Sequence, residues 1–476
     1  MLAVSLLAAG GCASSGGVAA GLLGGRGGLI SEAEESELGA KEHPRIIAAF
    51  GGVYVSPQVQ QAVEDIAGRL ARASERPDIT YQVTILNSPS VNAFALPGGY
   101  LYATRGLLAL SGDADELAAV LAHEIGHVVA RHAAKRQSQA IRAVLLGGVG
   151  GVLRQPGESS QALRDSDSVI ASFSRGQELE ADRIGVEMAV RAGYDPYAAV
   201  TFLNSMAREA EERVQGLGKD NEALRPNLQS THPTTPERIA RVRTLSRDLG
   251  FVPAQRARQS KGYLAAIDGL LYGDDPQEGF IRGREFLHAK ARFAFSVPKG
   301  FSLQNSPDAV FAVGAQDAAL RFDSIAVESG LSLEQYMRSA WGGGAAMTNL
   351  RSTEINGRPA AVAEARFAGW EYRLATIRFG PGQAFRFLFA AQKIDAALEA
   401  DFSAMLGSLR ALSEAEAARL LPLRIRVITV KAGDSVQKLA GRMSEQSRAE
   451  EKFRLLNGLS QTGRLRPGQS VKIIAE

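Results

Sequence analysis

The chain has 476 residues, of which 45% are hydrophobic, and it carries a formal net charge of +3 at pH 7. This length suits roughly two to four domains with buried cores. The charge is too small, and the basic runs too short, to indicate a nucleic-acid partner. A single cysteine, Cys12, excludes an intrachain disulfide framework.

The N-terminal residues resemble a lipoprotein signal peptide. Met1 to Gly11 is apolar and precedes Cys12, which such a signal would leave lipidated at the mature N-terminus. Residues 1–28 would then be a signal peptide and tether, and the protein would be periplasmic, attached to the outer membrane through Cys12. A positive region before the apolar run is missing, so a short flexible N-terminus is the alternative. No segment reaches the ~18 consecutive apolar residues that span a bilayer.

Two strands are expected before the first chemical motif. Thr80 to Asn87 is rich in β-branched residues. Val91 to Leu96, which includes Asn92, Ala93 and Phe94, follows it. This second segment is either an edge strand that pairs with an extended substrate backbone or an ordinary core strand and turn.

The stretch His123-Glu124-Ile125-Gly126-His127 is an HExxH motif on a predicted helix, which Asp113 to Glu116 opens with acidic residues. Residues at i and i+4 share one helix face, so His123 and His127 can hold one metal ion. Glu124 would lie beside that ion, placed to take a proton from water. Zinc prefers such ligands and leaves one position open in catalytic sites, so we predict one Zn²⁺ per chain.

A third ligand must come from elsewhere in the chain. Ser174 to Arg183 is predicted to be a helix, on which Glu178 and Asp182 share one face while Glu180 points nearly the opposite way. Glu178 could bind zinc while Asp182 hydrogen-bonds a ligand histidine. The alternative is a solvated acidic helix face.

His132 is the competing third ligand. The pattern HExxHxxGxxH would need a glycine at 130 and a histidine at 133, where this chain has Ala130 and Ala133. His132 follows His127 by five residues, which places it roughly 140° further round a continuous helix. We therefore expect a packing or helix-end histidine.

HEIGH followed by ELEAD resembles the HExxH…ExxxD arrangement of the HtpX/BepA-like zinc metallopeptidases, the gluzincins of peptidase family M48. Asn92 to Gly99, Arg191 to Pro196, and Ser230 to Pro233 with Arg238 resemble further segments of that family. The resemblance implies a mainly α (α+β) zincin-type metalloprotease domain, which we place at residues 29–250. It makes zinc ligands of His123, His127 and Glu178, and it makes Glu124 and Asp182 catalytic, as the base and as a supporting group.

Four further features have two interpretations each, and the resemblance bears on two of them, His232 and Asn92 to Phe94. It implies that His232 approaches the zinc and holds the enzyme latent; otherwise this histidine is an ordinary loop residue. Arg238 could stabilise the transition state or form a surface salt bridge. The resemblance favours the substrate-edge interpretation of Asn92 to Phe94. Ala143 to Asp167, between the metal motifs, is expected to be a mobile lid or membrane-touching loop, or else a packed hairpin.

Residues 251–290 are expected to be a connector and residues 291–412 an α+β domain of unknown role. Alternating apolar residues predict strands, and two segments are predicted to be helical, Leu333 to Ala340 and Ile394 to Leu406. The strands are expected at Phe293 to Val297, Ala309 to Val313, Ala319 to Phe322, Ala360 to Phe367, Tyr372 to Phe379 and Phe385 to Phe389.

Residues 424–476 resemble a LysM module with strand-helix-helix-strand order. The resemblance rests on Val430 to Asp434 near the start and Leu465 to Gln469 near the end. Such modules bind N-acetylglucosamine-containing glycans such as peptidoglycan; the alternative is a module that only packs on the rest of the chain. BepA-like relatives instead carry helical repeats, but no 34-residue period is present here.

The sequence thus indicates a multidomain zinc endopeptidase of the cell envelope, acting on misfolded or misassembled envelope proteins. A zinc-bound but latent chaperone-like or peptidoglycan-binding factor is one alternative. A hydrolase of peptidoglycan peptides is another.

Overall fold

The computed structural model describes residues 31–136, 173–217, 228–251, 260–314, 318–328, 330–341, 346–444 and 448–476. The described residues divide into two compact units. The large unit holds those up to Gly273 together with Pro422–Glu476, and the middle unit holds Asp274–Leu421. Cys12 and the predicted lid, Ala143 to Asp167, lie outside the described residues.

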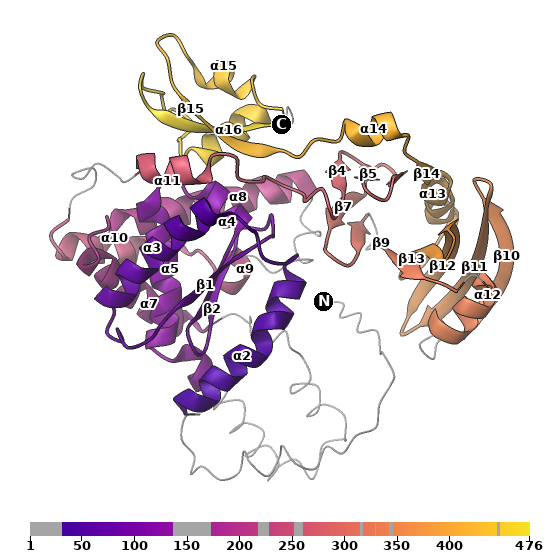
Figure 1. The fold of residues 1–476 in the computed structure, drawn as a ribbon, viewed down its shortest axis with the longest axis horizontal. Coiled ribbons are helices and arrows are strands. Elements are labelled where there is room, and N and C mark those ends of the chain that lie inside the picture. Colours follow the sequence, from indigo (N-terminus) through magenta and orange to yellow (C-terminus); the bar gives the residue numbers. More distant parts are fainter. Residues whose placement is uncertain are drawn as a thin grey trace. The chain divides into compact units, whose positions relative to one another are not determined.

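The N-terminal part of the large unit is a set of helices around a small sheet (Figure 1). Its sheet has the order β1-β3-β2, with β1 parallel and β2 antiparallel to the central β3, so β2 is an edge strand. None of the described helices is long and apolar enough to cross a membrane. The elements are α2 (Glu32–Ala49), α3 (Pro57–Ala73), β1 (Gln82–Leu86), β2 (Ala93–Leu96), β3 (Tyr100–Thr104), α4 (Arg105–Leu110), α5 (Ala114–Val129), α7 (Arg175–Arg191), α8 (Tyr197–Leu217), α9 (Leu228–Thr231), α10 (Pro236–Asp248) and α11 (Ser260–Ile267).

Helix α5 lies in the centre of this unit. Asp113 caps its N-terminus by accepting a hydrogen bond from the backbone N–H of Glu116, and nearly every following side chain through His127 is buried. Two glycines let α5 and α7 approach each other closely. A Cβ at Gly126 would lie 3.0 Å from the Ala181 carbonyl oxygen, and one at Gly185 would lie 3.0 Å from the His123 backbone nitrogen.

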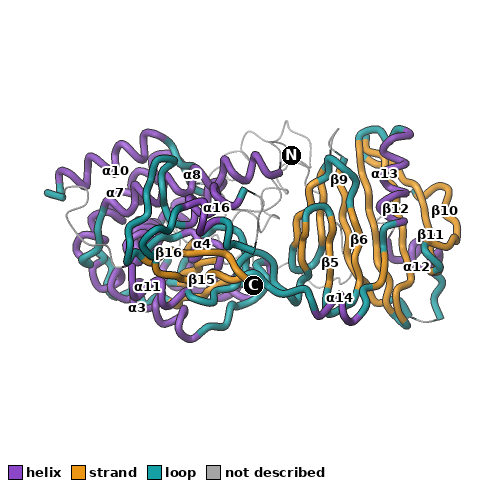
Figure 2. The backbone as a smooth tube through the Cα atoms, turned by 90° about the horizontal axis from the view of Figure 1, so that it is seen from above, coloured by secondary structure: helices purple, strands orange, loops and turns teal. Residues whose placement is uncertain are grey.

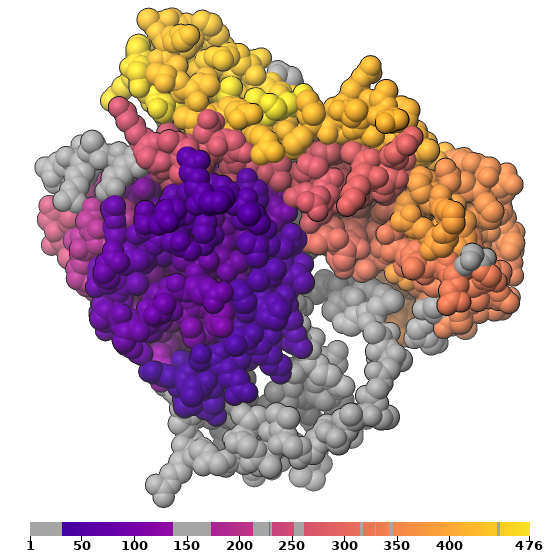
Figure 3. Space-filling model, viewed as in Figure 1, coloured from indigo at the N-terminus to yellow at the C-terminus, as the bar shows by residue number. Residues whose placement is uncertain are grey.

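The C-terminal segment has the predicted strand-helix-helix-strand order: β15 (Arg424–Thr429), α15 (Val436–Ala440), α16 (Ala449–Leu456) and β16 (Ser470–Ala475). Its apolar residues belong to the same hydrophobic core as α3, α5 and α8. The buried Lys472 donates hydrogen bonds to the carbonyls of Ala109, Leu110 and Ser111, at the end of α4. Figure 3 shows this segment in yellow against α11, with which β15 and β16 are in contact. We call residues 422–476 the C-terminal module.

The middle unit is built on antiparallel sheets (Figure 2). One has the order β10-β11-β12-β13-β9-β8-β7, the other β14-β6-β5-β4. Phenylalanines from both sheets, among them Phe295, Phe322 and Phe387, share one core. The elements are β4 (Phe280–Arg282), β5 (Glu285–His288), β6 (Phe293–Ser296), β7 (Ser302–Asn305), β8 (Val310–Val313), β9 (Ala319–Ala326), α12 (Leu333–Tyr336), β10 (Met347–Ile355), β11 (Arg358–Phe367), β12 (Trp370–Gly380), β13 (Gln383–Ala391), α13 (Ala396–Gly407), β14 (Arg410–Ala411) and α14 (Glu414–Ala418).

These elements confirm the six strands and two helices predicted for residues 291–412, whereas β7, β10 and β14 were not predicted, and two further differences are found. The segment expected to be a connector contains α11, β4 and β5, because strands of three or four residues leave little alternation to detect. The helix predicted over Leu333 to Ala340 changes after Tyr336 into the π-helical turn η5, Met337–Trp341.

Candidate metal centre

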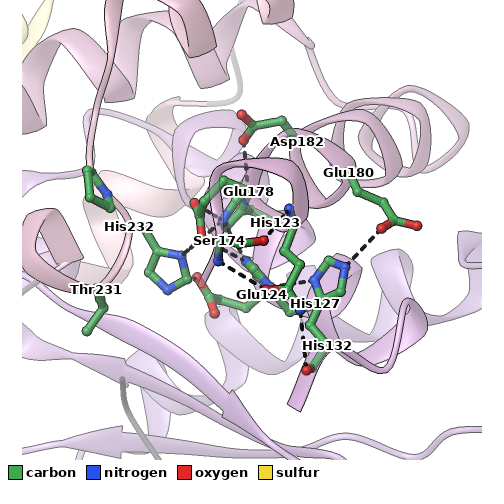
Figure 4. Close-up of polar contacts among 12 residues, drawn as sticks. His123, Glu124, His127, His132, Ser174, Glu178, Glu180, Asp182, Thr231 and His232 are labelled. Carbon is green, nitrogen blue, oxygen red and sulfur yellow. Dashed lines mark hydrogen bonds and ion pairs between the residues drawn. The ribbon is translucent and has the colours of Figure 1, made fainter. Parts of the chain in front are cut away.

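Helix α5 brings both motif histidines into one buried site (Figure 4). Nε2 of His123 and Nε2 of His127 lie 3.1 Å apart. Glu124, between them, is 1% exposed, and its Oε1 has no hydrogen-bond partner among the described residues. Nε2 of His232 lies 3.6 Å from this Oε1.

Helix α7 supplies the carboxylates. Ser174 caps this helix through a capping box with Gln177, one turn before Glu178. Glu178 places Oε2 3.4 Å from Nε2 of His123 and Oε1 3.5 Å from Nε2 of His127. Asp182, one turn on, places Oδ1 3.0 Å from Nδ1 of His123. The two carboxylates therefore contact opposite nitrogens of the same imidazole, as the shared helix face predicts.

His232, just after α9, completes the cluster. Its Nδ1 lies 2.9 Å from Oε1 of Glu178 and 3.3 Å from Nε2 of His123. Ligand atoms from His123, His127, Glu178 and His232 all lie within 4.8 Å of one another, and all four residues are buried.

These residues fit a zinc ion. Three imidazole nitrogens and a carboxylate oxygen are donors that Zn²⁺ prefers, and four is its usual coordination number. Imidazole nitrogens surround a carboxylate here, and an oxygen of Glu124 without a partner among the described residues lies nearby. One metal cation shared by these atoms satisfies them better than hydrogen bonds alone would.

Arg238, on α10, is buried rather than on the surface. It binds Asp182 through two hydrogen bonds, from Nε at 2.8 Å and from Nη2 at 2.7 Å, and its Nη1 lies 3.0 Å from Oε2 of Glu178. Nη1 also donates to the carbonyl of His232. Arg238 thus connects both carboxylates to the loop that carries the fourth potential ligand.

The protonation behaviour of the metal-free site follows from burial and these contacts. Burial alone would lower the pKa of His123, but hydrogen bonds to Asp182 and Glu178 raise it to about 10. Burial would raise the pKa of Asp182, but hydrogen bonds from Arg238 and His123 hold it below its ordinary value. Burial raises the pKa of Glu124, which lacks such partners. Glu124 is therefore the carboxylate best suited to exchange a proton.

His132 is a helix-end histidine, as expected, and it lies outside the four-residue cluster. The angle expected from a continuous helix is wrong, however, because α5 ends at Val129 and Arg131 takes a left-handed conformation with φ of 53°. The chain therefore turns back, and Nδ1 of His132 lies 2.8 Å from Nδ1 of His127. Nε2 of His132 lies 3.1 Å from Glu180. These contacts could not be predicted from helical periodicity.

The space beside the cluster is small. A cavity of about 40 Å³ is bounded on one side by His123, Glu124 and His232 and on the other by apolar residues of α5, α8 and α9, including Phe202 and Leu228. This volume holds about one water molecule. The ring of Phe173 stacks on His127 with centroids 4.0 Å apart, a contact that the sequence did not indicate.

The predicted substrate strand is an edge strand, β2. Ala93 and Phe94 are buried, so their side chains also serve the core. Asn92, just before β2, is fully buried. Neither the oxygen nor the nitrogen of its side-chain amide has a hydrogen-bond partner among the described residues.

Comparison with known proteins places this site in a family. The profile of peptidase family M48 matches residues 57–246. The beta-barrel assembly-enhancing protease of Yersinia pestis is 30% identical over 243 residues, which cover 48% of each chain. The same-named protease of Escherichia coli is 27% identical, over 46% of this chain and 45% of its own.

The mitochondrial metalloendopeptidase OMA1 of Schizosaccharomyces pombe is 34% identical over 182 residues, which cover 38% of this chain and 51% of its own. This chain thus spans about half the length of the curated relatives that it matches. Residues 57–246, which hold the HExxH helix, the glutamate helix and the His232–Arg238 segment, match the model of peptidase family M48, and this part of the chain is similar to the metallopeptidases named above.

Proposed function

We propose that the protein is a zinc-dependent endopeptidase. The observation that carries this proposal is the convergence of His123, His127 and Glu178 beside the buried, unpartnered Oε1 of Glu124. A site that only stores a metal has no need of a carboxylate between its two histidine ligands.

Each residue of the site has a role in peptide hydrolysis. His123, His127 and Glu178 would hold the zinc, which when bound polarises the scissile carbonyl and lowers the pKa of water. Glu124 takes a proton from the attacking water and delivers it to the leaving amine. Asp182 orients His123, and Arg238 keeps Asp182 ionised and in place.

The resting enzyme is latent in this proposal. His232 lies where it can fill the coordination position that a catalytic zinc keeps open for water. The cavity of about 40 Å³ beside it is too small for a large peptide side chain. Activity then requires His232 to move away, together with the loop that Arg238 holds through its hydrogen bond to the His232 carbonyl.

An extended peptide would bind along β2. Among the described residues no further strand pairs with the outer edge of β2, so this edge would offer backbone hydrogen-bonding groups to a substrate. Arg238, with Nη1 3.0 Å from Oε2 of Glu178, is the proposed group that stabilises negative charge in the transition state.

We further propose the cell envelope as the place of action. The lipoprotein-like segment ending at Cys12 and the name of the relatives, beta-barrel assembly-enhancing protease, support a periplasmic enzyme attached to the outer membrane. Its substrates would be misfolded or misassembled envelope proteins.

Glycan binding by the C-terminal module is a second candidate function. A cavity of about 890 Å³, within the usual range for ligand sites, lies between the module and the N-terminal end of α5. Its lining includes the polar residues Asp113, Asn204, Arg208, Lys261, Gln461, Arg466 and Gln469. Co-sedimentation with purified peptidoglycan tests this function; the protein should pellet with the glycan, and Gln461→Ala with Gln469→Ala should reduce the bound fraction.

Cleavage of unfolded casein, followed by mass spectrometry, tests the peptidase proposal. The zinc-loaded protein should produce peptides. Glu124→Gln should lower the rate by at least about 10²-fold, because the general base is lost, while Glu187→Gln on α7, away from the site, should leave it unchanged. Because the resting enzyme is latent in this proposal, the comparison is repeated in the His232→Ala background, where equal rates with and without Glu124→Gln would contradict the proposal.

Latency has its own test. His232→Ala should cleave casein faster than the wild type, because it opens the fourth coordination position. His288→Ala, in the middle unit, is the matched control. A slower His232→Ala enzyme that still binds zinc would show that His232 assists catalysis rather than capping the site.

A further inference from the structure

We infer that His132 and Glu180 form a positioning pair that fixes which nitrogen of His127 carries its proton, and so prepares His127 to bind the metal. The inference deepens the proposed function, because it concerns the same site. It rests on two contacts in series: Glu180 Oε2 to His132 Nε2 at 3.1 Å, and His132 Nδ1 to His127 Nδ1 at 2.8 Å.

The carboxylate sets the direction of both hydrogen bonds. An ionised carboxylate only accepts, so Nε2 of His132 must donate to Glu180. A neutral imidazole that donates from Nε2 has an unprotonated Nδ1, which can only accept. Nδ1 of His127 must therefore donate to it, and this leaves Nε2 of His127 without a proton.

That free nitrogen is the one in the metal cluster. Nε2 of His127 lies 3.1 Å from Nε2 of His123 and 3.5 Å from Oε1 of Glu178. The tautomer that Glu180 imposes on His127 thus leaves unprotonated the same nitrogen that lies among the other potential ligand atoms. His123 has the corresponding support from Asp182, which contacts its Nδ1 directly at 3.0 Å.

The local fold holds His132 for this role. The left-handed Arg131 reverses the chain after α5, and its side chain is tied to Glu35 on α2 at 3.2 Å. His132 is 0% exposed, whereas the side chain of Glu180 is 43% exposed. A buried histidine therefore connects a metal ligand to a carboxylate at the surface of α7.

The first test measures the zinc affinity of the full chain by competition with a chelator. His132→Phe keeps the ring but cannot accept the hydrogen bond, and it should weaken zinc binding by about 10- to 100-fold. His132→Asn places an amide oxygen near the former Nδ1 and should restore most of the affinity. Glu180→Gln, whose amide can donate as well as accept, should weaken binding less than His132→Phe, and Glu187→Gln should not weaken it.

The second test reads the proton directly in the metal-free protein. Nitrogen NMR of ¹⁵N-histidine-labelled protein should show His127 protonated on Nδ1 in the wild type and in His132→Asn, and a mixture of tautomers in Glu180→Gln. Wild-type zinc affinity in His132→Phe, or an unchanged tautomer in Glu180→Gln, would overturn the inference. Neither readout needs catalysis, so failure of both the wild type and His232→Ala to cleave casein would refute the proposed function and leave this result standing.

Discussion

At the metal centre, one arginine supports two carboxylates. Arg238 contacts Asp182 and Glu178, and all three side chains are buried. The sequence identified the residue types of this site because HExxH and ExxxD each place their groups one helical turn apart. It could not show that Arg238 is buried or that His132 contacts His127, since both depend on where helices end and how loops return.

Arg238→Met should therefore destabilise the metal-free protein. It leaves buried carboxylates without their cation, and losing one partner of a buried ion pair costs about 3–5 kcal/mol. Urea unfolding measures the change in the free energy of unfolding. The double variant Arg238→Met with Asp182→Asn should recover part of the loss, because the uncompensated charge is removed. A double variant less stable than Arg238→Met would contradict this account.

At the scale of elements, the distance between α5 and α7 sets the metal site, because one helix carries the histidines and the other the carboxylates. Gly126 and Gly185 permit the close approach. The sequence predicted both helices but not their contact, because a glycine in a helix does not reveal which neighbour approaches it. The short helix α4 and strands β4, β5 and β7 also escaped prediction, being too brief to show a period. Strand β10 is nine residues long but mostly exposed, so its apolar residues do not alternate.

Gly185→Ala should weaken zinc binding by pushing the helices apart. Its Cβ would lie 3.0 Å from the backbone of Ala122 and His123, and backbone atoms cannot move aside as a flexible side chain can. Gly176→Ala on the same helix has no atom within 4 Å of the added Cβ and serves as the control. Chelator competition measures both variants. Equal affinities would mean that the helix spacing tolerates the methyl group.

At the scale of the molecule, the C-terminal module is built into the large unit. Ile425, Phe453 and Ile474 lie in the same core as α5, and Gly269 and Leu270 exchange backbone hydrogen bonds with Ile425. The sequence predicted the order of the module's elements from short motifs. It gave no sign of this packing, because an apolar residue does not reveal whether its partner lies inside or outside its own module.

Ending the chain after Leu421 should therefore destabilise the M48 domain, because its core would lose the module's apolar residues. Thermal unfolding of the truncated protein should lack a cooperative transition at the wild-type temperature. Replacing residues 276–419 with a flexible linker should preserve that transition, because the middle unit has its own cores. A truncated protein as stable as the wild type would show that the module does not contribute to the stability of the domain.

Lys472 should make stability depend on pH. Burial lowers its pKa from 10.5 to about 7. Between these values the unfolded chain holds a proton that the folded chain lacks, so the free energy of unfolding should rise as the pH increases from 7 to 10. Lys472→Met should lack this part of the rise. If the free energy of unfolding of the wild type and of Lys472→Met changed with pH in the same way, the three carbonyl acceptors would be keeping the buried ammonium charged.

A zinc titration of the metal-free protein, with the rate of casein cleavage as the readout, tests the central claim most directly. We expect the wild-type rate to rise and level off at one zinc per chain. Glu124→Gln should bind the same single zinc and remain inactive. A wild-type protein that binds one zinc without gaining activity, even when His232 is replaced by alanine, would contradict the assignment of this site as a peptidase centre.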